Sequence, residues 1–399
     1  MPAAATAVLG YTRAPTEPPL NPQTATASPA ASAERLLALD VFRGLTMAAM
    51  VIVNNPGDWG HVYWPLRHAE WHGWTPTDLI FPFVLFIVGV SLTLSTRTLG
   101  AFTPVVRRTL VIFGLGLLLA LFPYFPFGRL RWPGVLQRIA VCYFITVVIY
   151  RQVAASGIGR PKQATRLAVV TAVLLFGYWA VMMLVPVPGG VAGDLGPEGN
   201  LAAWLDRAVL PGRLWQRTWD PEGLLSTVPA IGTTMLGVLA GLWLGETGRS
   251  GRAARGLLVG GAVAVVAGWL WGLAFPINKN LWTSSYVVFT AGGASMLVGA
   301  LVWGIDVRGV KGWTKPFIVL GMNAITLFVL SGLLVKALNL IRVPAGNVGS
   351  IPLSEWIFDS FFVPLASPHN ASLLYAVAHL VVLYGVLALM YRRRLFLKA

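Results

Sequence analysis

Long apolar stretches separated by short polar segments dominate the chain from residue 36 onward. Each stretch has roughly 17 to 25 residues, the length that a helix needs to cross the hydrocarbon core of a bilayer. The ten stretches lie at 36–54, 77–96, 109–127, 134–150, 166–186, 224–244, 256–275, 284–304, 315–339 and 371–391. This pattern predicts an all-α polytopic membrane protein with about ten transmembrane helices.

Two segments depart from the regular pattern. Residues 1–34 are rich in Ala, Pro and Thr and lack the basic segment and compact apolar stretch of a secretory signal. We expect a disordered tail at 1–34 and one transmembrane domain at 35–399. Within the ninth apolar stretch, Gly321, Met322 and Asn323 predict a kink or a close helix contact.

Lys and Arg residues cluster in alternate connections between the apolar stretches. The basic segments lie at 151–166, 249–255, 308–315 and 392–398. Because cytoplasmic loops carry an excess of positive charge, both termini and the tail are expected in the cytoplasm. The opposite side, the periplasm of a bacterium, then holds the loops 55–76, 187–223 and 340–370.

The composition supports this interpretation. Of the 399 residues, 56% are hydrophobic and 11% are charged, whereas about 25% of an ordinary soluble protein is charged. An ordinary cytosolic enzyme and a disordered protein are therefore excluded. The net charge of +15 follows from the positive cytoplasmic segments and does not indicate a nucleic-acid partner. The single Cys142 excludes an intrachain disulfide and a Cys-based zinc site, and we expect no metal.

The first periplasmic loop concentrates polar side chains among aromatic ones. It reads VNNPGDWGHVYWPLRHAEWHGWTPTDLIFPF and holds three of the five histidines. Thr75 and Pro76 predict the start of a helix, where the dipole would stabilise the carboxylate of Asp78. Trp residues are also typical of a membrane interface, and a single His there can simply point towards water. The spacing alone leaves a catalytic and a structural interpretation open.

Six blocks along the chain carry a resemblance to a known family. They read LDVFRGLTMAAMVIVNNPG, HAEWHGWTPTDLIFPFVLFIVGVSL, RWPGVLQRIAVCYF, WDPEGLLSTVPAIGTTMLGVLAG, PINKNLWTSSYVVFTAG and GMNAI. In this order they resemble the heparan-alpha-glucosaminide N-acetyltransferase family, most closely its bacterial, NagX-like members. The resemblance implies an enzyme of the bacterial inner membrane. It would transfer acetyl from cytosolic acetyl-CoA to the amine of a glucosamine-type sugar on the periplasmic face.

The resemblance also implies three catalytic residues. His68 lies in the His-Ala-x-Trp block and is expected to act as general base or as acetyl carrier. Asn54 ends the first span and is expected to stabilise the oxyanion. Asp78 occupies the T-x-x-D-L-x-F-P stretch and is expected to orient the imidazole. Direct transfer and a ping-pong route through His68 both stay open.

Two further groups of residues are expected to bind the substrates. Acetyl-CoA is a co-substrate with a charged nucleotide that cannot cross the membrane freely. Its expected partners are Arg43, Gln137, Arg138 and Lys315, and the expected acceptor contacts are His72, Asn278, Lys279 and Trp282.

Other functions also fit ten spans. A sugar or amino-sugar transporter is one alternative, and an O-acyltransferase acting on envelope glycans is another. The oligomeric state stays open, with a homodimer among the alternatives.

Overall fold

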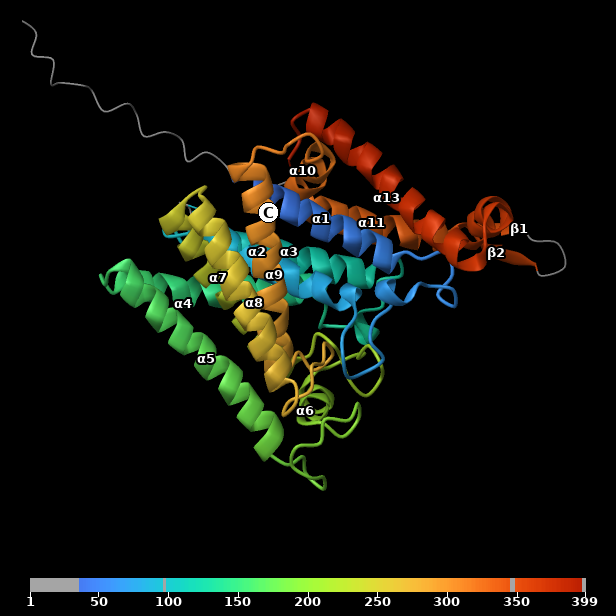
Figure 1. Cartoon of the computed structure of the whole chain (residues 1–399). Helices are drawn as coiled ribbons and strands as arrows, with labels where there is room; N and C mark the ends of the chain where they lie inside the picture. Colours follow the sequence, from blue (N-terminus) through green and yellow to red (C-terminus); the bar gives the residue numbers. More distant parts are fainter. Residues whose placement is uncertain (1–35, 96–97, 345–348, 397–399) are drawn as a thin grey trace, which may run out of the picture. The chain divides into compact units, whose positions relative to one another are not determined.

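The computed structural model describes residues 36–95, 98–344 and 349–396, so the tail predicted at 1–34 lies outside the described residues. The regular secondary structure of the described chain is helical apart from a small hairpin of β1 (Arg342–Pro344) and antiparallel β2 (Ser350–Pro352). Its α-helices are α1 (Leu37–Asn54), α2 (Ile80–Leu94), α3 (Thr103–Leu121), α4 (Val135–Ala155), α5 (Arg160–Leu184), α6 (Leu201–Val209), α7 (Leu224–Thr247), α8 (Gly251–Trp271), α9 (Ser284–Leu301), α10 (Lys315–Met322), α11 (Ala324–Leu340), α12 (Leu353–Ile357) and α13 (Pro368–Arg392) (Figure 1).

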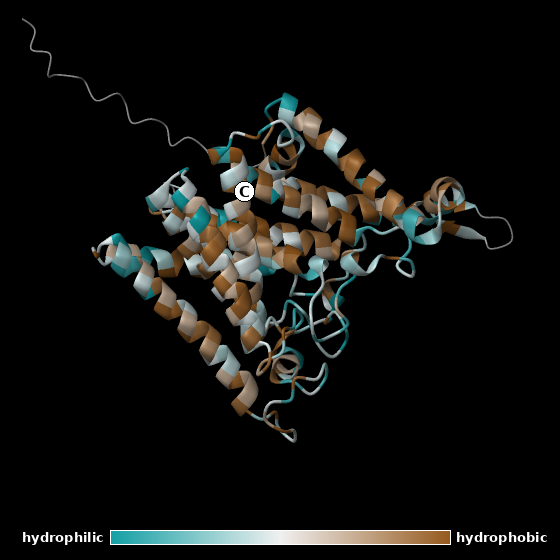
Figure 2. Cartoon of the chain, viewed as in Figure 1, coloured by the Kyte–Doolittle hydropathy of each residue, from teal (hydrophilic) through white to brown (hydrophobic). Residues whose placement is uncertain are grey.

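The helices confirm the prediction of an all-α polytopic membrane protein. Across the described ranges, nine helices are long and apolar enough to cross a membrane, or ten if α10 and α11 form one span. Figure 2 shows hydrophobic colour along these helices and hydrophilic colour at their ends and in the loops. The predicted kink is also confirmed, because α10 and α11 meet at Asn323 with a bend of 80°.

Close helix contacts hold the centre of the bundle. Helix α2 packs along α7, α8 along α9, and α1 along α10. Glycines allow the first and last of these contacts, since a Cβ at Gly237 would overlap the main chain of Phe86. A Cβ at Gly321 would likewise overlap the carbonyl of Asp40. Small residues let neighbouring backbones approach closely, which is how helices associate in membranes.

Several loops gather at one end of the bundle (Figure 1). The amide of Gly73 donates to the carbonyl of Ile277 at 2.7 Å, and the indole of Trp71 donates to the carbonyl of Leu195 at 2.8 Å. Helix α6 lies within residues 187–223, which the sequence pattern predicted as a loop without a helix. These contacts tie together the loops that precede α2, α7 and α9, and we call this the loop end of the bundle.

Candidate active site

His68 and Asp78 form a hydrogen-bonded pair at the loop end. His68 Nδ1 lies 2.6 Å from Asp78 Oδ1. The Asp78 side chain is 1% exposed, whereas 47% of the His68 side chain is exposed. Because an ionised carboxylate only accepts, this contact places a proton on Nδ1, and in the neutral ring the lone pair is then on Nε2.

The start of α2 positions the Asp78 carboxylate. Residues Pro76–Leu79 form a 3-10 turn that leads into α2, and Thr75 and Asp78 make the reciprocal contacts of a capping box. Asp78 Oδ2 accepts from the amides of Thr75 and Ala69, each at 3.0 Å. The helix start predicted from Thr75 and Pro76 is confirmed, and the turn fixes one end of the His68–Asp78 pair.

The loop between α8 and α9 brings a lysine to this pair. Lys279 Nζ lies 2.9 Å from His68 Nδ1 and 3.2 Å from His68 Nε2. It is also 3.6 Å from Asp78 Oδ1. Burial lowers the pKa of the Lys279 ammonium, and the neighbouring Asp78 carboxylate opposes this shift. A titratable amine, an imidazole and a carboxylate therefore meet at one point.

Asn278 and His72 extend this cluster. Asn278 is fully buried, and its Nδ2 lies 3.3 Å from His72 Nδ1. Burial lowers the pKa of His72, which favours the neutral ring. His72 Nδ1 can then accept from the amide. Asn278 Oδ1 accepts from the amide of Leu281 at 2.9 Å, so the loop that carries Lys279 is fixed from within.

Arg138 is a buried cation on the first turn of α4. Its side chain is almost completely buried, and Nη2 donates to the carbonyl of Gly223 at 3.1 Å and to Ser226 Oγ at 2.5 Å. The guanidinium lies over the ring of Trp282, 5.0 Å from its centroid. Among the described residues, Nε and Nη1 of Arg138 have no hydrogen-bond partner. Unused buried donors are rare, and guanidinium groups bind ligand oxygens well.

An ion-pair cluster that was not predicted from the sequence lies in the same group of loops. Arg131 Nε donates to Asp220 Oδ2 at 2.7 Å, and its Nη2 donates to Asp220 Oδ1 at 2.6 Å and to Glu222. Arg131 also lies over the ring of Trp215. The sequence signal for this contact was charge. The loop that carries Arg131 is basic, the loop that carries Asp220 and Glu222 holds these two acids, and the alternation of ten spans places both loops on one side of the membrane. This cluster joins the loop before α4 to the loop before α7.

The remaining predicted site residues lie in different places. Asn54 is the exposed last residue of α1, at the loop end, and makes no side-chain hydrogen bond among the described residues. Gln137 is buried and lies against Gly116 and Gly134. Trp282 is buried too, and its indole donates to Thr233 Oγ1 at 3.1 Å.

Two of the predicted acetyl-CoA partners lie away from the loop end. Arg43 is near the start of α1, where its Nη2 donates to Ser91 Oγ at 3.0 Å and its Nη1 contacts Asp40 and Gly321. Lys315 is exposed at the start of α10. The structure thus groups His68 with Asp78, His72, Asn278 and Lys279. It separates that cluster from Arg43 and Lys315.

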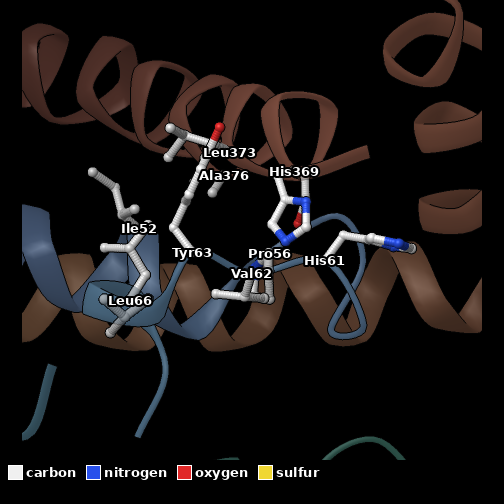
Figure 3. Close-up of a pocket in the computed structure, with 11 residues that line it drawn as sticks. Ile52, Pro56, His61, Val62, Tyr63, Leu66, His369, Leu373 and Ala376 are labelled. Carbon is white, nitrogen blue, oxygen red and sulfur yellow. The ribbon is translucent and has the colours of Figure 1, made fainter. Parts of the chain in front are cut away.

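A second Asp–His pair occurs in the same loop. His61 Nδ1 lies 2.6 Å from Asp58 Oδ2, but the Asp58 side chain is 41% exposed. Figure 3 shows His61 and His369 on one side of a small pocket, with apolar side chains such as Ile52 and Leu66 on the other. The two pairs share one contact distance and differ in the burial of the carboxylate. Burial of Asp78 and contact with Lys279 distinguish the His68 pair.

Comparisons with known proteins point to one family. The family model described as heparan-alpha-glucosaminide N-acetyltransferase, catalytic, matches residues 35–187. The protein named heparan-alpha-glucosaminide N-acetyltransferase of Mus musculus is 31% identical over 360 residues, which cover 75% of this chain and 53% of the mouse protein. Its Homo sapiens counterpart is 30% identical over 360 residues, covering 74% of this chain and 52% of the human protein. The chain spans about half the length of the curated relatives it matches.

Proposed function

The chain belongs to the heparan-alpha-glucosaminide N-acetyltransferase family, and from this premise we propose that it is an acetyl-CoA-dependent amino-sugar N-acetyltransferase. The acetyl group passes from cytosolic acetyl-CoA to the amine of a glucosamine-type sugar on the other side of the membrane. We place the protein in the inner membrane of a bacterium. The observation that carries the proposal is the His68 imidazole, bound at Nδ1 to the buried Asp78, which leaves Nε2 as the basic nitrogen.

His68 is the proposed general base. An amine attacks a thioester only through its free lone pair, so the reaction needs a group that removes a proton near neutral pH. The Nδ1–H bond to Asp78 fixes the tautomer in which Nε2 accepts that proton. As the amine nitrogen bonds to the thioester carbon, the C–S bond breaks, and the CoA thiolate takes up the proton.

Asn54 is proposed to stabilise the negative charge that develops on the acetyl oxygen. Asn54 lies at the loop end with its amide unused among the described residues, and an amide donor suits an oxyanion. A donor of this kind typically contributes about 10²–10³ in kcat.

The donor is proposed to lie along the bundle, with its phosphates at the end that bears Arg43 and Lys315. Arg43 and Asn54 are eleven residues apart on α1, and this corresponds to about 16 Å along the helix axis. An extended pantetheine arm covers a distance of this order. Arg138 and Gln137 are proposed to contact the arm, because Arg138 has two buried donors without partners among the described residues. His72 and Asn278 are proposed to contact the acceptor sugar.

Purified protein tests this proposal directly. It should convert glucosamine to N-acetylglucosamine and release CoA when acetyl-CoA is supplied, with both products measured by mass spectrometry. The variant His68→Ala should lose the activity, whereas His61→Ala, its counterpart in the exposed Asp–His pair, should retain it. Full activity of His68→Ala would contradict the assignment. Uptake of unmodified sugar into proteoliposomes without acetyl-CoA would instead favour a transporter.

A further inference from the structure

Lys279 holds a primary amine at the position that the acceptor amine has to reach. A general base takes a proton from a group about 2.6–3.2 Å away, and Lys279 Nζ lies 3.2 Å from His68 Nε2. His68 Nδ1 lies 2.6 Å from Asp78 Oδ1 and 2.9 Å from Lys279 Nζ, and the last two atoms are 3.6 Å apart. The angle at Nδ1 between the carboxylate and the amine is therefore close to a right angle. Lys279 therefore lies beside the imidazole and leaves the bond between His68 and Asp78 in place.

The surroundings of Lys279 keep its amine at this position. Its carbonyl accepts from the amide of Trp282 at 3.1 Å, and the preceding residue Asn278 is fully buried. The Lys279 side chain is only 18% exposed. Burial lowers the pKa of the ammonium and so increases the fraction present as the nucleophilic free amine.

We propose that Lys279 is a self-acetylation site, which accepts the acetyl group of acetyl-CoA when no sugar is bound. This inference rests on the proposed function, because it uses the same donor and the same base. The free amine of Lys279 forms a bond to the thioester carbon, and the C–S bond breaks. One Nζ proton passes to His68 Nε2 and then to the CoA thiolate. The products are acetyl-lysine and CoA thiol, and no other reactant is consumed.

Acetylation of Lys279 changes the charge and the space beside His68. The acetylated nitrogen is an uncharged amide, and its added methyl and carbonyl groups fill the position at which a sugar amine reacts. Bound acceptor excludes the lysine amine from that position. Self-acetylation is therefore a slow inactivation that the acceptor sugar prevents.

Peptide mass spectrometry of the full-length protein tests the proposal. Protein incubated with acetyl-CoA and without sugar should acquire an acetyl group on Lys279 at least tenfold faster than on the exposed Lys162, which reports on uncatalysed acetylation. Glucosamine should slow the modification of Lys279 and leave that of Lys162 unchanged. His68→Ala and Asp78→Asn should each prevent the fast reaction, with thermal unfolding showing which variants are folded.

The possible results separate this inference from the proposed function. If the protein acetylates glucosamine while Lys279 stays unmodified, the self-acetylation proposal is wrong and the proposed function stands. If Lys279 is acetylated no faster than Lys162, or equally fast in folded His68→Ala, the reaction is uncatalysed and the proposal is also wrong. If neither sugar nor lysine is acetylated, both proposals are overturned.

Discussion

The substitution Asp78→Asn tests the geometry around His68 while preserving the shape of the buried side chain. The carboxylate accepts from His68 Nδ1 through one oxygen and from the amides of Ala69 and Thr75 through the other. An asparagine has one acceptor and one donor group, so it can satisfy only one side of this arrangement. If its NH₂ faces His68, then Nδ1 must accept, and the proton moves to Nε2, where the base needs a lone pair.

The cost follows from these contacts. Loss of the correct tautomer removes general-base catalysis, which contributes about 10²–10⁴ in rate. In the opposite orientation of the asparagine, two half-buried amides lose their acceptor, at a cost of up to about 1–3 kcal/mol each. We therefore expect kcat/KM for acetyl transfer to fall at least about 100-fold, the lower end of the range for lost general-base catalysis. This loss corresponds to a rise of about 2.7 kcal/mol in the activation free energy.

The matched control is Asp58→Asn. Asp58 has the same 2.6 Å contact to a histidine in the same loop, but its carboxylate is 41% exposed. Water can replace the lost interactions there, so this variant should keep activity within about threefold. Both variants are assayed by initial rates with acetyl-CoA and glucosamine, alongside thermal unfolding in detergent. Near-normal activity of Asp78→Asn, or an equal loss in both folded variants, would refute the reasoning.

Three further predictions concern other parts of the molecule. Replacing Arg138 by Gln should raise KM for acetyl-CoA about tenfold or more, because a charged donor is lost; an unchanged KM in steady-state assays would exclude contact with the donor. Burial raises the pKa of Asp206 from 3.8 to about 6. For an acid this shift lowers stability as pH rises from the unfolded value to the folded one, so Asp206→Asn should raise Tm more at pH 7 than at pH 5. Equal shifts at both pH values would contradict the pKa assignment. On α7, Gly237→Ala should destabilise the protein by about 1–3 kcal/mol because its Cβ would overlap Phe86. The control Gly245→Ala has room for the methyl group, and equal melting temperatures for the two variants would show that α2 and α7 can separate.

Most of the fold could be predicted from the sequence because bilayer thickness sets the length of an apolar stretch. The predicted spans 36–54 and 224–244 agree with α1 (Leu37–Asn54) and α7 (Leu224–Thr247) to within a few residues. The limits of α3 were less accurate, since this helix begins at Thr103 and the prediction began at residue 109. Arg107 and Arg108 fall in its first turns, and hydropathy alone cannot assign charged residues to a helix that starts outside the apolar core.

Local sequence patterns could predict only the first-loop part of the candidate site, whereas Asn278 and Lys279 were expected from the family resemblance. Thr75, Asp78 and His68 lie close together in the sequence, and the capping preference of Thr75 indicates a helix start. The approach of Lys279 to His68 depends on how the loop between α8 and α9 folds against the first loop. The pattern of hydrophobic and polar residues carries no information about such a contact between two loops that are far apart in the sequence. The pairing of Arg131 with Asp220 was missed for the same reason.

The anchors of the first loop have a consequence for the order in which the protein can be assembled. Gly73 is bound to Ile277, while Gly57 donates to the carbonyl of Ser372 on α13. During synthesis the His68–Asp78 segment leaves the ribosome early, long before the last span exists. A nascent chain that ends before α13 carries the His68, Asp78 and Lys279 side chains but lacks the partner of Gly57. The first loop therefore gains both of its anchors only after α13 has been inserted into the membrane.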